Sequence, residues 1–406
     1  MNINRSKLGE IATVEISGVD KKIKDGEIPV KLCNFVDVYY NWAITSDMEK
    51  EFMEVTARPN EIERFKLKRG QVALTKDSET RFDIGIATYI ADDFDNVILG
   101  YHNALITPSP EKLCGKYLNA LLHTDYARTY FANNASGSGQ RYALSVDALN
   151  NFPVPLIPLA EQERIGDIFS SIDQKIALNR AINDNLEAMA KQLYDYWFVQ
   201  FDFPNEEGKP YKSSGGKMVW NEKLKREIPE GWEVLLVGDI LDKVQNTPRL
   251  VTNEYMTNGL YPIIDQTANI YYAGFTDRED AVSKQFPAVV FGDHSCAVKY
   301  VNFPFVRGAD GTQIMLSKDD RISIEYLYFA IKNIPLREGY ARHYSILKES
   351  YIIAPSISIA KLYHGFAAQQ FEMITSNRKE IIALSKQRDE LLPLLMNGQV
   401  SPLNSD

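Results

Sequence analysis

The sequence predicts an α+β protein in which two similar mixed domains are each followed by a long helix. Two observations carry this prediction. The first is an internal repeat that links the two halves of the chain, and the second is an apolar stripe at helical spacing that closes each half. A repeat of about two hundred residues is much longer than a solenoid unit, so it indicates duplicated domains.

The repeat is clearest around two tyrosines. Tyr117 lies 44 residues before Glu161, and Tyr326 lies 43 residues before Gln369; each interval ends at the entry to a helical pattern. A fainter echo joins residues 26–30 to residues 259–263, and each of these stretches is followed by a Tyr-Tyr pair. We therefore expect two copies of one fold.

Residues 1–158 are expected to form the first domain. Strands are predicted at 28–32, 71–75, 84–90 and 97–99, and one helix from Tyr117 towards Tyr130. Residues 134–140 have the composition of a loop, and residues 152–158 that of an extended exit strand. A polar connector at 204–226 precedes the second domain, 227–365, with strands at 288–291 and 297–301 and a helix at 324–331.

Two coiled-coil helices complete the predicted architecture. The central one covers residues 159–203, and the distal one, with the tail, covers 366–406 and begins near Ala367. Each would expose an apolar stripe in water, so we expect antiparallel packing with pseudo-two-fold symmetry. The predicted seam consists of Ile165, Ile168, Ile172, Ile182, Leu186, Met189, Leu193, Ile374, Ile381, Leu384, Leu391 and Leu395.

Composition favours a cytoplasmic protein. Hydrophobic residues make up 45% and charged residues 24% of the 406 residues, and no apolar run is long enough to span a bilayer. The N-terminus lacks the apolar core of a secretory signal, and three scattered cysteines argue against disulfides and zinc. The net charge of −9 counts against a general nucleic-acid binder, yet basic stretches at 112–142 and 332–348 occupy matching places.

Residues 155–165 (PLIPLAEQERI) and residues 391–400 (LLPLLMNGQV) resemble segments of the specificity (S) subunit of Type I restriction-modification systems. The first is similar to the entry into that family's central helix, and the second to the end of its distal helix. Residues 228–232 (IPEGW) with 237–240 (VGDI) resemble the start of a second target-recognition domain, and residues 7–11 (KLGEI) that of a first. The order of these motifs covers the full length.

The resemblance implies that each target-recognition domain reads one half of a bipartite target in double-stranded DNA. It also implies that the helix pair sets the spacing and docks methyltransferase (M) subunits, to which restriction (R) motor-nuclease subunits are added. This chain would be non-catalytic and bind no cofactor, because S-adenosylmethionine, ATP and Mg belong to the partner subunits. No membrane partner is expected.

The chemistry of the side chains indicates candidate DNA contacts, since Arg, Asn, Gln, Ser and His read base edges while Lys, Arg and backbone N–H groups hold phosphates. In both domains they lie in loops that follow a predicted strand or helix. The candidates are Lys76, Ser78, Arg81, Ser138, Gln140, Arg141 and Tyr142 in the first domain, and His294, Ser295, Arg307, Arg342, His343 and Tyr344 in the second.

Two other classes of function stay open. The run from Asp293 to Cys296 could suggest a hydrolytic or DNA-modifying enzyme, although triad members normally come from separate segments. A protein-binding scaffold without a DNA role is the other alternative. The aromatic pairs Tyr39-Tyr40 and Tyr271-Tyr272 are expected mainly to pack in the cores, with a minority facing DNA or a partner.

Overall fold

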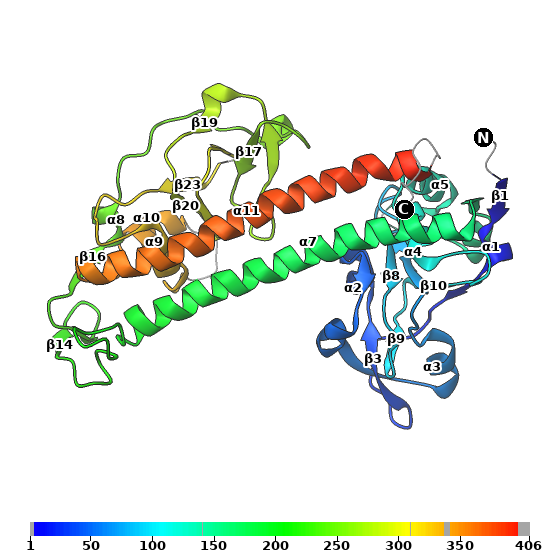
Figure 1. Cartoon of the computed structure of the whole chain (residues 1–406), viewed down its shortest axis with the longest axis horizontal. Coiled ribbons are helices and arrows are strands. Elements are labelled where there is room, and N and C mark those ends of the chain that lie inside the picture. Colours follow the sequence, from blue (N-terminus) through cyan, green and yellow to red (C-terminus); the bar gives the residue numbers. More distant parts are fainter. Residues whose placement is uncertain (1–3, 140, 309, 337–341, 397–406) are drawn as a thin grey trace, which may run out of the picture. The chain divides into compact units, whose positions relative to one another are not determined.

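The chain divides into two compact units in the computed structural model, which describes residues 4–139, 141–308, 310–336 and 342–396 (Figure 1). Unit 1 comprises residues 1–178 and 380–406, and unit 2 comprises residues 179–379. Each unit mixes short strands with helices around its own hydrophobic clusters, which confirms the predicted fold class.

The strands of unit 1 form small sheets. The largest has the order β2-β10-β6-β8-β4, made of β2 (Ala12–Ile16), β10 (Asn103–Pro108), β6 (Val72–Thr75), β8 (Ala87–Ile90) and β4 (Ala43–Ile44). The others are β5 (Met53–Ala57) with β3 (Ile28–Cys33) and β9 (Val97–Leu99), β11 (Ser136–Ser138) with β12 (Arg141–Ala143) and β7 (Asp77–Ser78), and β1 (Asn4–Lys7) with β13 (Pro153–Leu156).

The helices of unit 1 are short apart from its shares of the two long ones. They are α1 (Leu8–Ile11), α2 (Phe35–Tyr40), α3 (Pro59–Phe65), α4 (Gly115–Leu122), α5 (Asp125–Asn134) and α6 (Val146–Asn150), with the 3-10 turn η1 (Ser46–Glu51). The single helix predicted from Tyr117 to Tyr130 is thus two helices. Thr124 separates them because its hydroxyl accepts from the Ala127 N–H and caps α5.

Unit 2 repeats this mixture of elements. Its sheets are β18 (Gly274–Thr276), β17 (Tyr261–Ile264), β22 (Phe305–Arg307) and β19 (Val282–Ser283); β21 (Val298–Val301), β20 (Ala288–Gly292) and β23 (Thr312–Met315); β16 (Glu233–Leu236) with β24 (Tyr351–Ala354); and β14 (Met218–Asn221) with β15 (Arg226–Pro229). Its short helices are α8 (Val237–Ile240), α9 (Ile324–Lys332) and α10 (His343–Lys348), with η2 (Asp195–Val199), η3 (Thr252–Glu254) and η4 (Glu279–Ala281).

A central buried strand organises the core in both units. In β6, Val72 and Leu74 belong to one hydrophobic cluster and Ala73 to another, because successive side chains point to opposite faces of a sheet. In β20, Val289 likewise belongs to one cluster and Val290 to the other. The two faces of the same strand therefore hold the helical and the β-rich parts of each unit together.

Matching tyrosine hydrogen bonds confirm the repeat at atomic detail. The Tyr117 hydroxyl in α4 donates to the Pro155 carbonyl of β13 at 2.8 Å, and the Tyr326 hydroxyl in α9 donates to the Ile353 carbonyl of β24 at 2.5 Å. Pro155 and Ile353 lie just before the long helices α7 (Leu159–Tyr194) and α11 (Ile357–Met396), respectively. Each tyrosine therefore fixes the strand that leads into that helix.

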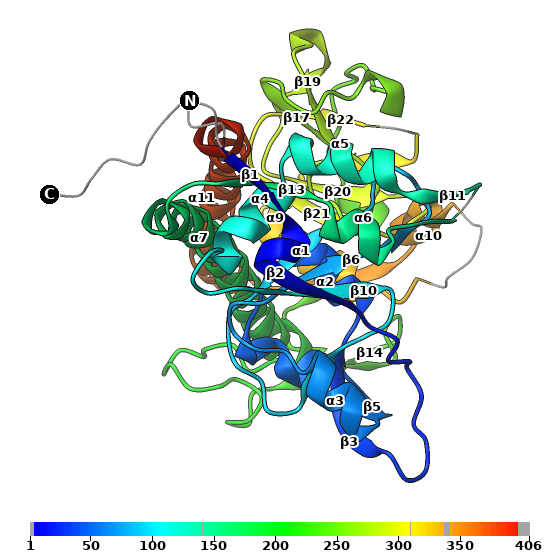
Figure 2. The same ribbon diagram turned by 90° about the vertical axis from the view of Figure 1, so that its right-hand side faces the viewer.

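In each copy, the first segment is hydrogen-bonded to the exit strand region of that same copy. The Leu8 N–H donates to the Phe152 carbonyl and the Val237 N–H to the Ser350 carbonyl, both at 2.9 Å. β1 pairs with β13, which Figure 2 shows beside α1, and β16 pairs with β24 in the same antiparallel sense. The first and last strands of each copy thus close on one another.

The second long helix begins earlier than predicted. α7 spans Leu159–Tyr194, close to the expected start, whereas α11 spans Ile357–Met396 and not 366 onwards. The prediction aligned Gln369 with Glu161 and so overlooked the helix-start signal of Pro355 and Ser356; the Ala360 N–H bonds to the Ser356 carbonyl. The polar connector is also more structured than expected, because β14 and part of β15 lie within it.

The two long helices pack antiparallel in each unit. In unit 2, the Tyr363 hydroxyl of α11 donates to the Ala190 carbonyl of α7 at 3.2 Å, and the Asn377 amide donates to Asn183 at 2.9 Å. In unit 1, Lys175 of α7 forms an ion pair with Glu380 of α11. Rising numbers in α7 therefore meet falling numbers in α11, as predicted.

The buried face of the long helices differs from the predicted seam at Met189. Met189 is 49% exposed, and Ala190 takes its place on the buried face. Phe169 and Ile176 are buried but were not predicted. Of the other seam positions, Ile165, Leu186 and Ile374 are buried; Ile168, Ile172, Ile182, Leu193, Ile381, Leu384 and Leu391 are partly buried; and the side chain of Leu395 lies outside the described part of the chain.

Gln162 anchors α7 to the loop that precedes α4. Its side chain, 1% exposed, accepts from the Cys114 N–H at 2.9 Å and donates to the carbonyls of Lys112 and Ile157 at 3.1 and 2.9 Å. These three bonds satisfy backbone groups that the helix would otherwise cover. A buried polar group without a partner costs about 1–3 kcal/mol.

We expect Gln162→Leu to lower the free energy of unfolding by about 3 kcal/mol, because it removes these hydrogen bonds while conserving volume. Urea denaturation of the full chain, with hydrogen exchange at residues 112–122 as a local probe, measures the effect. The matched control is Gln174→Leu on the exposed face of the same helix. Equal stability of the two variants would contradict the anchoring role.

Burial also lowers the pKa of one histidine of unit 1, His123. The His123 ring stacks on Trp42 with ring centres 4.3 Å apart, and its Nε2 lies 2.9 Å from the Ala87 carbonyl oxygen. Burial, reinforced by the nearby Arg388 charge, lowers the pKa of His123 from 6.5 to about 3. The imidazole is therefore neutral in the folded state near neutral pH.

We expect unit 1 to lose stability as the pH falls below about 6.5, because the unfolded chain protonates His123 and the folded state does not. The slope contributed by this residue approaches about 1.4 kcal/mol per pH unit. His123→Phe should flatten the dependence of the unfolding midpoint on pH between 7 and 5.5, measured by urea titration. An unchanged slope would show that the imidazole titrates freely.

Candidate DNA-reading loops

The predicted contact residues of unit 1 gather around one small sheet. β12 pairs with β7, so Tyr142 lies opposite Ser78, and the Arg81 guanidinium lies 5.2 Å from the centre of the Tyr142 ring. Ser138 of β11 pairs with Arg141 of β12, so the predicted loop at 134–140 is partly a hairpin strand. Gln140 lies outside the described residues, and nothing further is assigned to it.

Lys76 is less available for a DNA contact than its residue type suggests. Its ammonium group lies 2.7 Å from the Asp77 carboxylate, which also receives His102 Nδ1 at 2.5 Å. Burial pushes the pKa of Asp77 upward, but the hydrogen bonds from Lys76 and His102 outweigh it and lower that pKa overall. Lys76 therefore balances a buried carboxylate, and its role as a phosphate contact stays a prediction.

His102 occupies a backbone position that favours glycine. Its φ is 70°, in the left-handed region, and the equivalent residue before β23 in unit 2 is Gly311, with φ of +86°. The equivalence rests on matching bonds, from the Lys76 N–H to the His102 carbonyl and from the Asp293 N–H to the Gly311 carbonyl. Unit 1 thus keeps an imidazole at a strained position that unit 2 fills with glycine.

A cavity of about 620 Å³ opens beside this network in unit 1. Aromatic residues of α2 and acidic residues of the loop after β7 line it, together with His102 and Arg141. On one wall the Tyr39 hydroxyl donates to both oxygens of the Asp83 carboxylate, at 2.9 and 2.8 Å. This hydrogen bond is the main reason that the pKa of Tyr39 rises to about 12. Tyr39, Asp83, Asp77 and His102 were not among the predicted contacts, because no motif marks them.

In unit 2, four of the predicted residues meet around Asp293. The Asp293 carbonyl accepts from the His343 N–H at 3.2 Å, and its carboxylate accepts from the Tyr344 N–H at 2.8 Å. His294 and Ser295 follow directly, and the Ser295 hydroxyl donates to the Gln266 carbonyl at 2.5 Å. Because the Asp293 carboxylate and the Ser295 hydroxyl fix loops, these contacts do not resemble a catalytic triad.

His343 is a core residue and not a base-reading one. It is 1% exposed, and its Nδ1 lies 2.9 Å from the Asp293 carbonyl oxygen. The matching bond in unit 1 is donated by Leu144, which is also buried, to the Lys76 carbonyl. The prediction from residue type failed because imidazole here occupies an apolar position. Arg342, the residue before it, is exposed.

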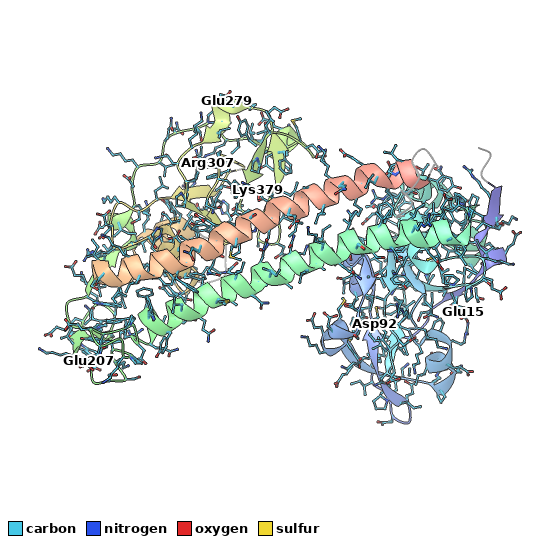
Figure 3. All side chains as sticks on the ribbon, viewed as in Figure 1. Glu15, Asp92, Glu207, Glu279, Arg307 and Lys379 are labelled. Carbon is cyan, nitrogen blue, oxygen red and sulfur yellow. The ribbon has the colours of Figure 1, made fainter. Side chains whose placement is uncertain are left out.

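Arg307 is similarly enclosed. Figure 3 labels it in the β-rich part of unit 2, where it ends β22; it is 7% exposed and donates to the Thr247 carbonyl at 3.3 Å. Burial, with a smaller contribution from the Arg249 charge, lowers its pKa. An exposed phosphate clamp, as predicted, would not be desolvated in this way.

One lysine of each matching basic stretch holds α7. Lys116 of α4 donates to Asp167 at 2.7 Å in unit 1, and Lys332 of α9 donates to Glu187 at 2.8 Å in unit 2. Both acids belong to α7. The positional match that suggested DNA contacts for these two lysines therefore reflects a shared packing role.

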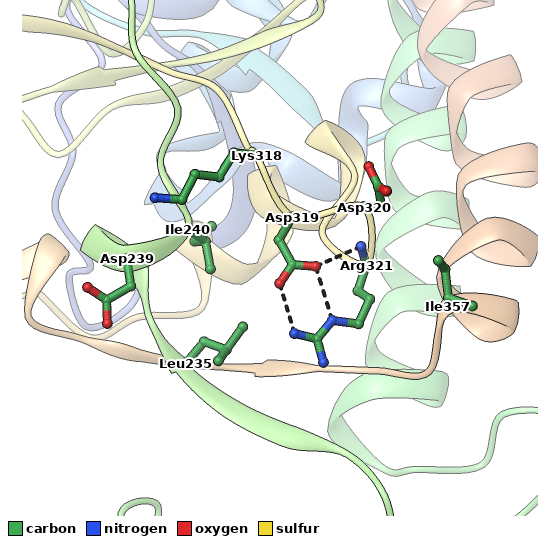
Figure 4. A pocket seen from close by; sticks show the side chains of 8 residues that line it. All are labelled: Leu235, Asp239, Ile240, Lys318, Asp319, Asp320, Arg321 and Ile357. Atoms are coloured by element: carbon green, nitrogen blue, oxygen red, sulfur yellow. Dashed lines mark hydrogen bonds and ion pairs between the residues drawn. The ribbon is translucent and has the colours of Figure 1, made fainter.

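A cavity of unit 2 is lined by an ion-paired arginine that joins two segments of the chain. Figure 4 shows the Arg321 guanidinium paired with the Asp319 carboxylate by two hydrogen bonds of 3.0 and 2.9 Å. Glu233 adds a third contact at 3.0 Å. This arrangement fastens β16 to the loop before α9. Within the described ranges, no group of three His, Cys, Asp or Glu residues could hold a metal ion.

The candidate loops of unit 1 lie within a segment that matches a known family model. The family model for the Type I restriction modification DNA specificity domain matches residues 4–188. The MjaIX specificity subunit of a Type I restriction enzyme from Methanocaldococcus jannaschii is 27% identical, covering 97% of this chain and 91% of its own. The HindI specificity subunit from Haemophilus influenzae is 24% identical, covering 82% and 87%.

The fold also matches a solved structure. The S subunit of a Type I restriction-modification system from M. genitalium aligns with a TM-score of 0.57 at 14% identity, covering 100% of this chain and 98% of that one. Within the part of the chain that the structure describes, no helix is long and apolar enough to cross a membrane.

We expect His343→Ala to destabilise the full chain by about 2–3 kcal/mol, because it empties a buried site and removes the contact with the Asp293 carbonyl. Arg342→Ala, its exposed neighbour, is the matched control and should change stability by less than about 0.5 kcal/mol. Urea titration measures both. A stable His343→Ala protein would place this side chain outside the core.

Proposed function

This chain belongs to the family of Type I restriction-modification specificity subunits, and from that premise we propose that each unit reads one half of a bipartite double-stranded DNA target. The chain itself carries out no catalysis. The observation that supports two different half-targets is a shared scaffold with divergent loops. Equivalent positions hold His102 and Gly311, Lys76 and Asp293, and Leu144 and His343.

The partners supply the chemistry. Methyltransferase subunits bind S-adenosylmethionine and modify the target, and motor-nuclease subunits use ATP and Mg to cut unmodified DNA, in the cytoplasm. The long helices offer docking surface, because in unit 2 the side chains of Met189, Leu362 and Met373 are exposed on them. Met189 and Phe366 also line a cavity of about 850 Å³.

The proposal is tested by combining the chain with its cognate methyltransferase subunit and selecting bound sequences from a randomised DNA library. A bipartite motif with a fixed gap is expected. Binding of all sequences with equal affinity would exclude a reading function. S-adenosylmethionine binding by the isolated chain, measured by calorimetry, would favour the enzyme alternative.

We expect the double variant Arg81→Ala, Arg141→Ala to weaken DNA binding by the complex and to reduce the slope of log K against log salt by about 2, because each phosphate contact contributes about one. Lys68→Ala, another exposed basic residue of unit 1, is the control. Fluorescence anisotropy between 50 and 200 mM salt provides the measurement. An unchanged slope would show that neither Arg81 nor Arg141 contacts a phosphate.

A further inference from the structure

Unit 1 exposes an unusual combination of apolar and acidic groups at the mouth of its cavity. Tyr40, which is 75% exposed, lines this cavity together with Asp83 and Glu79, and Phe82, the residue before Asp83 in the sequence, is 84% exposed. Large exposed aromatic side chains grouped together mark binding surfaces more often than plain solvent-facing surface. Acidic side chains at a DNA-reading surface require a separate explanation, since they repel phosphates.

Asp77 and Asp83 differ in how many further hydrogen bonds their carboxylates can accept. Asp77 is nearly enclosed and already accepts from Lys76 and His102 through one oxygen. Asp83 accepts the Tyr39 hydroxyl proton with both oxygens, whereas an ionised carboxylate has about four acceptor directions. Asp83 is partly exposed and lines the cavity, so it can accept further hydrogen bonds from a ligand.

Tyr39 holds this carboxylate in place. Its ring stacks with Phe35 at 5.7 Å and meets the edge of Tyr40 at 4.8 Å. Because the raised pKa of Tyr39 keeps its hydroxyl protonated, Asp83 has a permanent donor on one side. The carboxylate is therefore oriented before any ligand arrives, which lowers the cost of using it for recognition.

A carboxylate can contribute favourably at a DNA surface only by accepting from a donor on the bases. In the major groove those donors are the exocyclic amino groups of cytosine and adenine, while guanine and thymine present only acceptors and a methyl group there. Building on the proposed function, we infer that Asp83 reads an exocyclic amino group, of cytosine or adenine, in the half-target of unit 1. Phe82 and Tyr40 pack against the adjacent base edges.

Positive charge beside the cavity allows the DNA duplex to approach Asp83. Arg141 lines the cavity, and Arg81 lies over Tyr142 on the neighbouring sheet. These guanidinium groups can hold the phosphates on either side of the base that Asp83 contacts. The acid then discriminates between bases without preventing the approach of the duplex.

The test compares Asp83→Ala with the matched variant Glu79→Ala, each in the full chain with its methyltransferase partner, by selection from a randomised library. Asp83→Ala should relax the preference at one base pair of one half-target, the pair whose cytosine or adenine supplies the amino group, by about 5- to 150-fold. Glu79→Ala removes the same charge from the same loop. It should strengthen binding to all sequences without altering any preference.

Base analogues separate the two sources of the amino group. The position that relaxes identifies the base, and a duplex in which that base lacks only its amino group (purine for adenine, pyrimidin-2-one for cytosine) is then bound. The wild-type complex should lose about the same factor on this duplex, and the Asp83→Ala complex should lose none.

Three results would overturn the inference. They are an unchanged motif in Asp83→Ala, full affinity of the wild-type complex for the duplex that lacks the amino group, and relaxation by Glu79→Ala to the same extent. If Asp83→Ala fails to fold, Tyr39→Phe decides, because it frees the carboxylate and should relax the same position by a smaller factor. A wild-type complex without any sequence preference would instead overturn the proposed function, and this inference with it.

Discussion

The structure depends on covering the apolar stripes of its two long helices. A helix of 36 or 40 residues with such a stripe on one face gains little stability alone in water. In unit 2, Leu186 and Ala190 of α7 and Phe371 and Ile374 of α11 share one hydrophobic cluster with α9. In unit 1, Ile165 and Phe169 of α7 join Leu392 and the residues of α4. The helix that follows the central sheet therefore acts in each unit as the cover for the helix pair.

The entry into each long helix is controlled by the same device. The buried tyrosine of α4 or α9 fixes the exit strand, and the first strand of the copy pairs with that strand. Gln162 reinforces this junction in unit 1, while Arg321 with Asp319 and Glu233 reinforces it in unit 2. The backbone plan is duplicated, but the polar groups that secure it are not.

Patterns that arise from local periodicity or composition were predictable from the sequence. The strands at 97–99 and 288–291 and the start of α7 follow from apolar spacing, and the duplication follows from the repeated intervals after Tyr117 and Tyr326. The start of α11 was missed because a chance similarity between Gln369 and Glu161 outweighed Pro355 and Ser356. Met189 was placed on the seam because strict heptad counting cannot detect a shift of one residue in the buried face.

The candidate site was less predictable, because residue type does not report burial. His343 and Arg307 carry DNA-reading chemistry and yet lie inside unit 2. Conversely, Tyr39, Asp83 and His102 come from three separate segments, and no spacing in the sequence brings them together. The loops that face solvent vary in chemistry while the bonds that position them repeat, which is how one scaffold can serve two recognition tasks.

One consequence concerns synthesis on the ribosome. Unit 1 is discontinuous: Arg388 of α11 lies 5.3 Å from the centre of the Trp42 ring, and Leu392 belongs to the same core as residues near the N-terminus. The domain translated first therefore cannot complete its interior until nearly the whole polypeptide has emerged. During that interval unit 1 exposes an apolar face. We therefore expect chaperones to bind this chain while it is being synthesised.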